Sequence, residues 1–176
     1  VYLAQDAWPG RGWLKCAYEC LEKSGKGLLA FNDGKWGGRI SSFGMVRMSW
    51  IRNIYKGAIL FPAYHSHEAD VELTVIARAL GMHEYNPECT LVEYDPDKDA
   101  GGSNPNDKAL FQKRFLHGFD GLVPWHRLKA LSKEYKMDGK QTRYKHGMTF
   151  AVLLENGSGK VGELLSSFFE NPTSHP

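Results

Sequence analysis

Two acidic residues near the middle of the chain, Asp70 and Glu72, have the types and spacing that acid–base chemistry needs. They flank Val71 at the expected start of a helix, where the helix dipole favours anions and can keep a carboxylate ionised. An ionised and positioned carboxylate is what a general base requires. The alternative is that Asp70 is an N-cap and Glu72 a first-turn acid, both serving the helix alone.

A third acidic residue, Asp6, follows the apolar, β-prone stretch Val1–Ala4 and precedes a loop rich in proline and glycine. Open α/β sheets bind ligands beyond the carboxyl ends of their strands. A carboxylate there can hold Mg²⁺ or Mn²⁺ bound to a diphosphate, because these hard cations prefer oxygen ligands. An ordinary loop aspartate that accepts a backbone hydrogen bond is the alternative.

Histidines and tryptophans supply two further hypotheses. His65 and His67 have Glu68 beside them, but the zinc-hydrolase helix needs two histidines four residues apart, so a zinc hydrolase is a minor alternative. The tryptophans either line a sugar or base cleft or pack in the core: Trp8, Trp13, Trp36 and Trp50.

The elements that must position these residues alternate between strands and helices, which predicts an α/β fold. Strands are expected over Val1–Ala4, Gly27–Phe31, Ile40–Met48 (where Gly44 indicates a close backbone approach), Cys89–Glu93 and Met148–Leu154. Helices are expected over Trp13–Lys23, Trp50–Tyr55 with Ser49 as its cap, Asp70 (as N-cap) to Gly81, Lys108–Leu116, Trp125–Lys136 and Lys160–Phe169.

Composition limits the remaining choices. A chain of 176 residues with 42% hydrophobic content can bury one sizeable core. Three cysteines without a Cys-x-x-Cys spacing favour a reducing compartment, and hence the cytoplasm, while no apolar run predicts a membrane span and no signal peptide is recognised. The segment Lys108–His146 has ten Lys or Arg against three acids, 10 − 3 = +7, which suits either an acidic partner or a solvated helix face.

The segment Leu60–Leu73, with the sequence LFPAYHSHEADVEL, and the ARALG sequence at 77–81 together resemble the acceptor-side motif of GT-A glycosyltransferases. Tyr85-Asn86-Pro87 and the strand after it follow the family order, and Val1–Asp6 resembles the strand that ends in the family's metal-binding acidic motif. Two positions depart from the family: Gln5 stands beside Asp6, and Ala69 replaces the Glu before the catalytic Asp.

The resemblance implies a GT-A-like (Rossmann-like) mixed sheet flanked by helices, incomplete or permuted. Residues 1–118 would be the acceptor-side portion, 95–107 a flexible loop, 119–147 a basic helical segment, and 148–176 a strand and helix like the start of a nucleotide-binding half.

The resemblance also implies an inverting transfer of a sugar from a nucleotide-sugar donor to a hydroxyl acceptor. Asp70 would be the general base and Glu72 a supporting acid. A divalent metal, Mn²⁺ or Mg²⁺, would be held by Asp6 and Glu93, and substrate contacts would come from Trp13, Asn32, Asp33, Tyr64, His65 and His67. A non-catalytic module that binds a glycan, a nucleic acid or a protein is the competing hypothesis.

Overall fold

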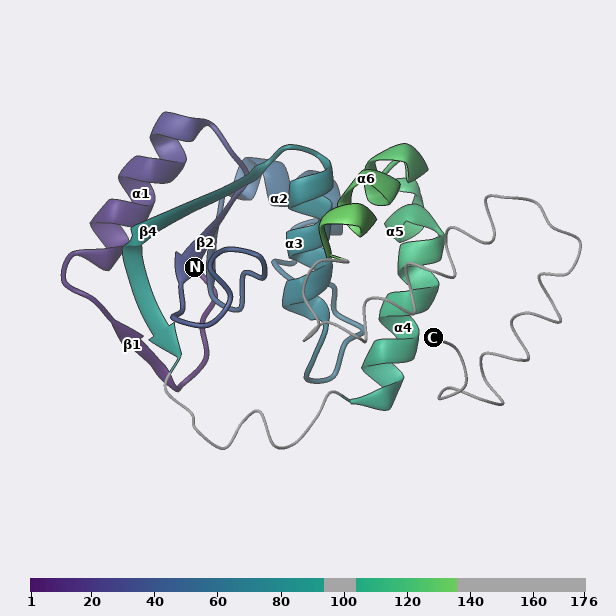
Figure 1. The fold of residues 1–176 in the computed structure, drawn as a ribbon, viewed down its shortest axis with the longest axis horizontal. Coiled ribbons are helices and arrows are strands. Elements are labelled where there is room, and N and C mark those ends of the chain that lie inside the picture. Colours follow the sequence, from purple (N-terminus) through teal and green to yellow (C-terminus); the bar gives the residue numbers. More distant parts are fainter. Residues whose placement is uncertain (94–103, 136–176) are drawn as a thin grey trace, which may run out of the picture.

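A mixed four-stranded sheet forms the centre of the computed structural model, which describes residues 1–93 and 104–135 (Figure 1). The strands are β1 (Ala7–Pro9), β2 (Leu28–Asn32), β3 (Gly44–Val46) and β4 (His83–Glu93), in the sheet order β1-β4-β2-β3. The central pair, β2 and β4, is parallel, and both outer pairs are antiparallel. The predicted α/β class is therefore confirmed.

Helices cover both faces of this sheet. They are α1 (Trp13–Ser24), α2 (Met48–Tyr55), α3 (Ala69–Ala79), α4 (Pro105–Leu116), α5 (Gly118–Gly121) and α6 (Trp125–Tyr135). In Figure 1, α1 lies on one side of the strands and α3 on the other, with α4 to α6 beyond α3. In the described residues, no helix is both long and apolar enough to span a bilayer.

The alternation of side chains along β2 explains this layering. Leu28 packs into the apolar cluster that includes α2, α3, α4 and α6, whereas Leu29 and Phe31 pack into a second cluster with Ala17 and Leu21 of α1. Because successive side chains of a strand point to opposite faces, one apolar strand is buried on both sides. The parallel pairing of β2 with β4 then requires a crossover connection, which contains α2 and α3.

Local sequence signals account for several helix ends. Gly25 ends α1 in the left-handed conformation, and its N–H donates to the carbonyl of Leu21. Lys56 ends α2 with a positive φ. At the start of α4, the side chain of Asn104 accepts a hydrogen bond from the N–H of Asn106, and Pro105 occupies the first turn.

Three strand predictions need correction. Val1–Ala4 is not a strand, because it contributes a single bridge between Tyr2 and Gly44, and the first strand is β1, inside the predicted loop. Of the strand predicted over Ile40–Met48, only β3 is observed. The residues before β3 belong to a loop, and α2 begins at Met48. The strand predicted at Cys89–Glu93 is longer and starts at His83.

Three further boundaries also differ. Ser49 lies inside α2, whose N-cap is Arg47. Asp70 is not the N-cap of α3, because Glu68 takes that position and Asp70 falls in the first turn. The loop predicted over 95–107 ends earlier, since α4 begins at Pro105, and its residues 95–103 lie outside the described ranges, as do the strand and helix predicted over 148–169.

Gly44 is the position where the close backbone approach is confirmed. A Cβ atom there would lie 2.6 Å from the hydroxyl oxygen of Tyr2, which itself donates to the carbonyl of Ser41 at 2.6 Å. The ring cannot move away without losing that hydrogen bond.

We therefore expect Gly44→Ala to lower the free energy of unfolding by about 1–3 kcal/mol through overpacking. Urea denaturation of a double-mutant cycle checks the cause, because Tyr2→Ala removes the ring and should make the second substitution much less costly. Equal costs of Gly44→Ala in both backgrounds would contradict this explanation.

Candidate functional site

Asp70 lies in the first turn of α3 with its side chain partly exposed. Its position is fixed through the backbone, because the hydroxyl of Thr74 donates to the carbonyl of Asp70 at 2.7 Å and accepts from the N–H of Ser41 at 2.9 Å. Ser41 is fully buried, and its Oγ lies 3.4 Å from Nε2 of His83 at the start of β4. The start of α3 is thus joined to the sheet by a short polar chain.

The N-terminal segment reaches the same place. Burial and the nearby carboxylate of Asp70 raise the pKa of the Tyr2 phenol well above its usual range. Tyr2 bridges to Gly44 at the β3 edge of the sheet, whereas Asp6 directly precedes β1 at the opposite edge, so the structure does not bring the predicted metal ligand beside the predicted base. One carboxylate oxygen of Asp6, Oδ1, is buried.

Glu72 has a different role from Asp70, although only one residue separates them. Its side chain is 0% exposed, and its two oxygens accept hydrogen bonds from the hydroxyls of Tyr55 and Tyr64 at 2.8 and 2.7 Å and from two nitrogens of Arg114 at 2.7 and 2.8 Å. Burial and then Glu72 raise the pKa values of both tyrosines, which keeps them protonated as donors. Glu72 therefore positions Tyr64 and Arg114 and cannot touch a substrate in this conformation.

The segment that precedes α3 carries three of the predicted substrate contacts. Tyr64 is half-buried and packs edge-on against Phe61, with ring centroids 5.9 Å apart. His65 is exposed, and His67 is partly buried with its Nδ1 2.8 Å from the hydroxyl of Ser66. The structure thus brings the two histidines and Asp70 onto one stretch at the N-terminal end of α3.

The other predicted substrate contacts are used to build the fold. Asp33 is 1% exposed, and its carboxylate accepts hydrogen bonds from the N–H groups of Lys35 and Trp36 and from the hydroxyl of Ser42. It shapes the loop after β2 and is not open to a ligand in this conformation. The remaining two residues are more accessible: Asn32 hydrogen-bonds Gly34 and Pro87, and Trp13 packs on Phe31 with ring centroids 5.3 Å apart.

The residues predicted to hold a metal differ in how well they fit one. Glu93 is opposite Ala7 in the sheet, and its carboxylate, with 7% of the side chain exposed, pairs with the ammonium of Lys35 at 3.4 Å. That arrangement makes Glu93 a poor metal ligand. Within residues 1–93 and 104–135, no three His, Cys, Asp or Glu side chains converge on a point where they would hold a metal ion.

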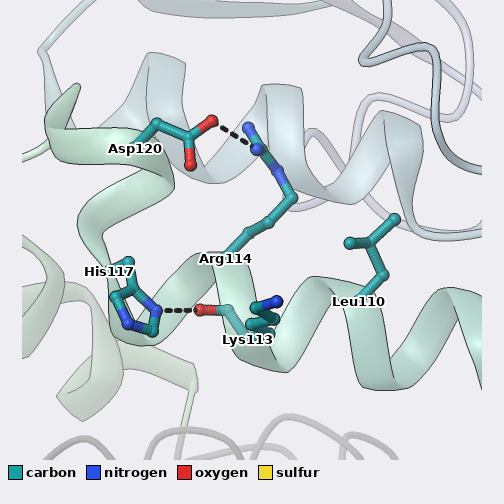
Figure 2. Close-up of a pocket in the computed structure, with 5 residues that line it drawn as sticks. All are labelled: Leu110, Lys113, Arg114, His117 and Asp120. Atoms are coloured by element: carbon teal, nitrogen blue, oxygen red, sulfur yellow. Dashed lines mark hydrogen bonds and ion pairs between the residues drawn. The ribbon is translucent and has the colours of Figure 1, made fainter.

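An open cavity of about 530 Å³ lies between α4 and α5, beside the ion pair of Arg114 with Asp120 (Figure 2). Figure 2 shows Asp120 reaching the guanidinium of Arg114, with N and O 2.6 Å apart, and the ring of His117 hydrogen-bonded to the carbonyl of Lys113. The described residues that line the cavity are Leu110, Lys113, Arg114, His117 and Asp120, and the predicted site residues are not among them.

Arg114 and Asp107 of α4 are the important residues that the sequence did not reveal. Arg114 binds Glu72 across 42 positions of sequence, and Asp107 binds the segment before α3 across 40 to 42 positions. A lysine- and arginine-rich helix gives no sign of which cation is buried. The only local signal for Asp107 is its place in the first turn of α4, which is also typical of an acid that serves the helix alone.

Arg114 pairs with both Glu72 and Asp120, and we expect the two pairs to differ strongly in their contribution to the free energy of unfolding. Arg114→Met leaves the carboxylate of Glu72 buried without its cation, so we expect the free energy of unfolding to fall by about 3–5 kcal/mol. Asp120→Asn is the matched control, because the side chain of Asp120 is 69% exposed and such a pair contributes less than about 1 kcal/mol. Urea denaturation of the two variants measures both, and similar losses would contradict the assignment.

His83 predicts a pH dependence of stability. Burial, and next the charge of Arg78, lower the pKa of His83 from 6.5 to about 4. Between these values the unfolded chain binds a proton that the folded chain does not, so the stabilisation is present above pH 6.5 and is lost as pH falls towards 4.

At 1.36 kcal/mol per pKa unit, the loss between pH 7 and pH 5 is roughly 2 kcal/mol. Denaturation curves of the wild type and His83→Gln at pH 7, 6 and 5 check it: the advantage of the wild type over the variant should shrink as the pH falls. The exposed His117→Gln variant should keep the wild-type slope, and parallel slopes for all three proteins would refute the assignment.

Comparison of the chain with protein-family models, with curated protein sequences and with solved structures found no match. The function must therefore be inferred from the placement of the described side chains. Its strongest elements are the partly exposed Asp70, the buried Glu72 beside it, and the histidine-bearing segment that precedes them.

Proposed function

We propose that residues 1–118 form the acceptor-side portion of a GT-A-like glycosyltransferase, which transfers a sugar from a nucleotide donor to a hydroxyl acceptor. The observation that carries the proposal is the contrast between two acids on the first turn of α3. Asp70 is partly exposed and held by its backbone, whereas Glu72 is fully buried and ion-paired. Asp70 is therefore the acid that solvent can reach, and Glu72 supports the site from inside.

In the proposed reaction, the carboxylate of Asp70 accepts the proton of an acceptor hydroxyl. The oxygen then attacks the anomeric carbon of the donor, and the bond from that carbon to the diphosphate oxygen breaks with its electron pair leaving on the diphosphate. Attack from the face opposite the leaving group inverts the configuration at that carbon. Asp70 suits the role because the N-terminus of a helix favours a charged carboxylate.

The leaving diphosphate needs charge compensation. Bound Mn²⁺ or Mg²⁺ would supply it, held by Asp6 together with phosphate oxygens and water. Asp6 directly precedes β1, at the sheet edge opposite the bridge of Tyr2 to β3, so this part of the proposal rests on the resemblance of Val1–Asp6 to the family's metal-binding motif. The ion pair of Glu93 with Lys35 leaves Glu93 outside this part of the proposal.

The test is turnover of a panel of nucleotide sugars by the complete protein with Mn²⁺, scored as released nucleotide diphosphate with and without chelator. We expect Asp70→Asn to lower turnover at least a hundredfold, since a general base contributes about 10²–10⁴-fold. Glu19→Gln is the control, because Glu19 is an exposed acid on α1 that pairs only weakly with Lys15 at 3.8 Å. Wild-type turnover by Asp70→Asn would eliminate the proposed base.

A further inference from the structure

The segment Pro62–His67 has no regular secondary structure, yet three of its successive backbone amides converge on one side chain. The N–H groups of His65, Ser66 and His67 each donate to the carboxylate of Asp107 at 2.9 Å. Asp107 is 2% exposed, and these hydrogen bonds, that of His65 first, lower its pKa to about 2. A carboxylate that accepts three amide hydrogen bonds fixes the backbone that donates them.

The same helix holds the segment at a second point. The guanidinium carbon of Arg114 lies 3.4 Å from the ring centroid of Phe61, and Arg114 shares Glu72 with the hydroxyl of Tyr64. Asp107 and Arg114 are seven residues apart, which places them on one face of α4 two turns apart. This face therefore contacts Phe61, directly before the segment, and residues 65–67 at the end of the segment.

The backbone conformation directly after the segment needs such support. Glu68 is the N-cap of α3 and has φ 69° and ψ −10°, a left-handed conformation that a residue other than glycine adopts at a cost of about 1–3 kcal/mol. Glu68 is also buried, and Asp70 follows two residues later. A change in the path of 65–67 would alter Glu68 and, with it, the direction of Asp70.

We propose that Asp107 is a positioning residue, which holds the segment 62–67 in the conformation that places an acceptor in front of Asp70. The exposed side chain of His65 and the partly exposed His67 then form the acceptor-facing surface. The acceptor role rests on the proposed function, whereas the hold on the segment stands on the hydrogen bonds alone.

The first test measures the hold without any substrate. Asp107→Asn keeps the volume of the side chain but replaces one accepting oxygen with a donor, so at least one of the three amides loses its acceptor. Hydrogen exchange is followed by NMR, and we expect the amides of 65–67 to exchange at least tenfold faster in this variant. The exchange rates of Leu28–Phe31 in β2 should stay unchanged. In the Glu19→Gln control, the exchange rates of all these amides should equal those of the wild type. Unchanged exchange at 65–67 would overturn the proposal.

The second test separates positioning from general loss of structure. Turnover with water in place of the acceptor needs the donor site but not the acceptor surface. We expect Asp107→Asn to raise the KM for the acceptor at least fivefold and to lower transfer by a larger factor than hydrolysis of the donor, which depends on Asp70 but not on the acceptor surface. An equal loss of transfer and hydrolysis would refute the positioning role.

A replacement variant covers the case in which Asp107→Asn does not fold, and the exchange measurement covers the case in which no turnover is found. Asp107→Ser, which retains a smaller acceptor, replaces Asp107→Asn if the latter does not fold, and it should show the same changes to a lesser degree. If the wild type turns over no nucleotide sugar, the proposed function fails, and the exchange measurement still decides whether Asp107 holds the segment.

Discussion

The buried ion pair between Glu72 and Arg114 joins α3 and α4 inside the apolar core. Removing two charges from water is costly, and the pair is tolerated because each of its partners finds several hydrogen bonds. Glu72 accepts four, from Tyr55, Tyr64 and Arg114, and Arg114 gives its remaining donor group to Asp120. Helix α4 cannot leave α3 without unpairing these groups. The segment before α3, and with it Asp70, keeps its place for the same reason.

The rotation of a helix explains how two acids two positions apart come to differ so strongly. Each residue of an α-helix turns by about 100°, so positions i and i+2 do not face the same side. Asp70 is partly exposed and near enough to Tyr2 for its charge to raise the pKa of that phenol, whereas the carboxylate of Glu72 is buried and bonds Tyr55 of α2 and Arg114 of α4. Substituting one for the other would place a charge on the wrong side of the helix.

Local patterns predicted much of the fold, and long-range pairing limited the rest. Helical periodicity located α1, α4 and α6, and Gly44 signalled a close approach, because these features depend on neighbouring residues. The strand at Val1–Ala4 was wrong because its β-prone residues found only one bridge to pair with. Asp70 was wrongly expected as an N-cap because side-chain preference cannot show that Glu68 takes a left-handed conformation under tertiary constraint.

The candidate site was predictable only as a set of residue types. Asp70, His65 and His67 could be named from their segment, whereas the groups that fix them, Asp107 and Arg114, come from a helix about 40 positions later. Nothing in the sequence near Glu72 shows that its charge is neutralised inside the protein. For Glu93, the partner that makes it a poor metal ligand is Lys35, on the loop after a different strand.

The bridge between Tyr2 and Gly44 has a consequence for how the molecule behaves among its own copies. Two backbone hydrogen bonds, at 2.9 and 3.1 Å, occupy the outer side of β3 at Gly44, opposite the side paired with β2. An uncovered strand edge is a template on which another chain can add a strand. At Gly44, Tyr2 therefore occupies the backbone groups of this edge with which a strand of another chain would pair.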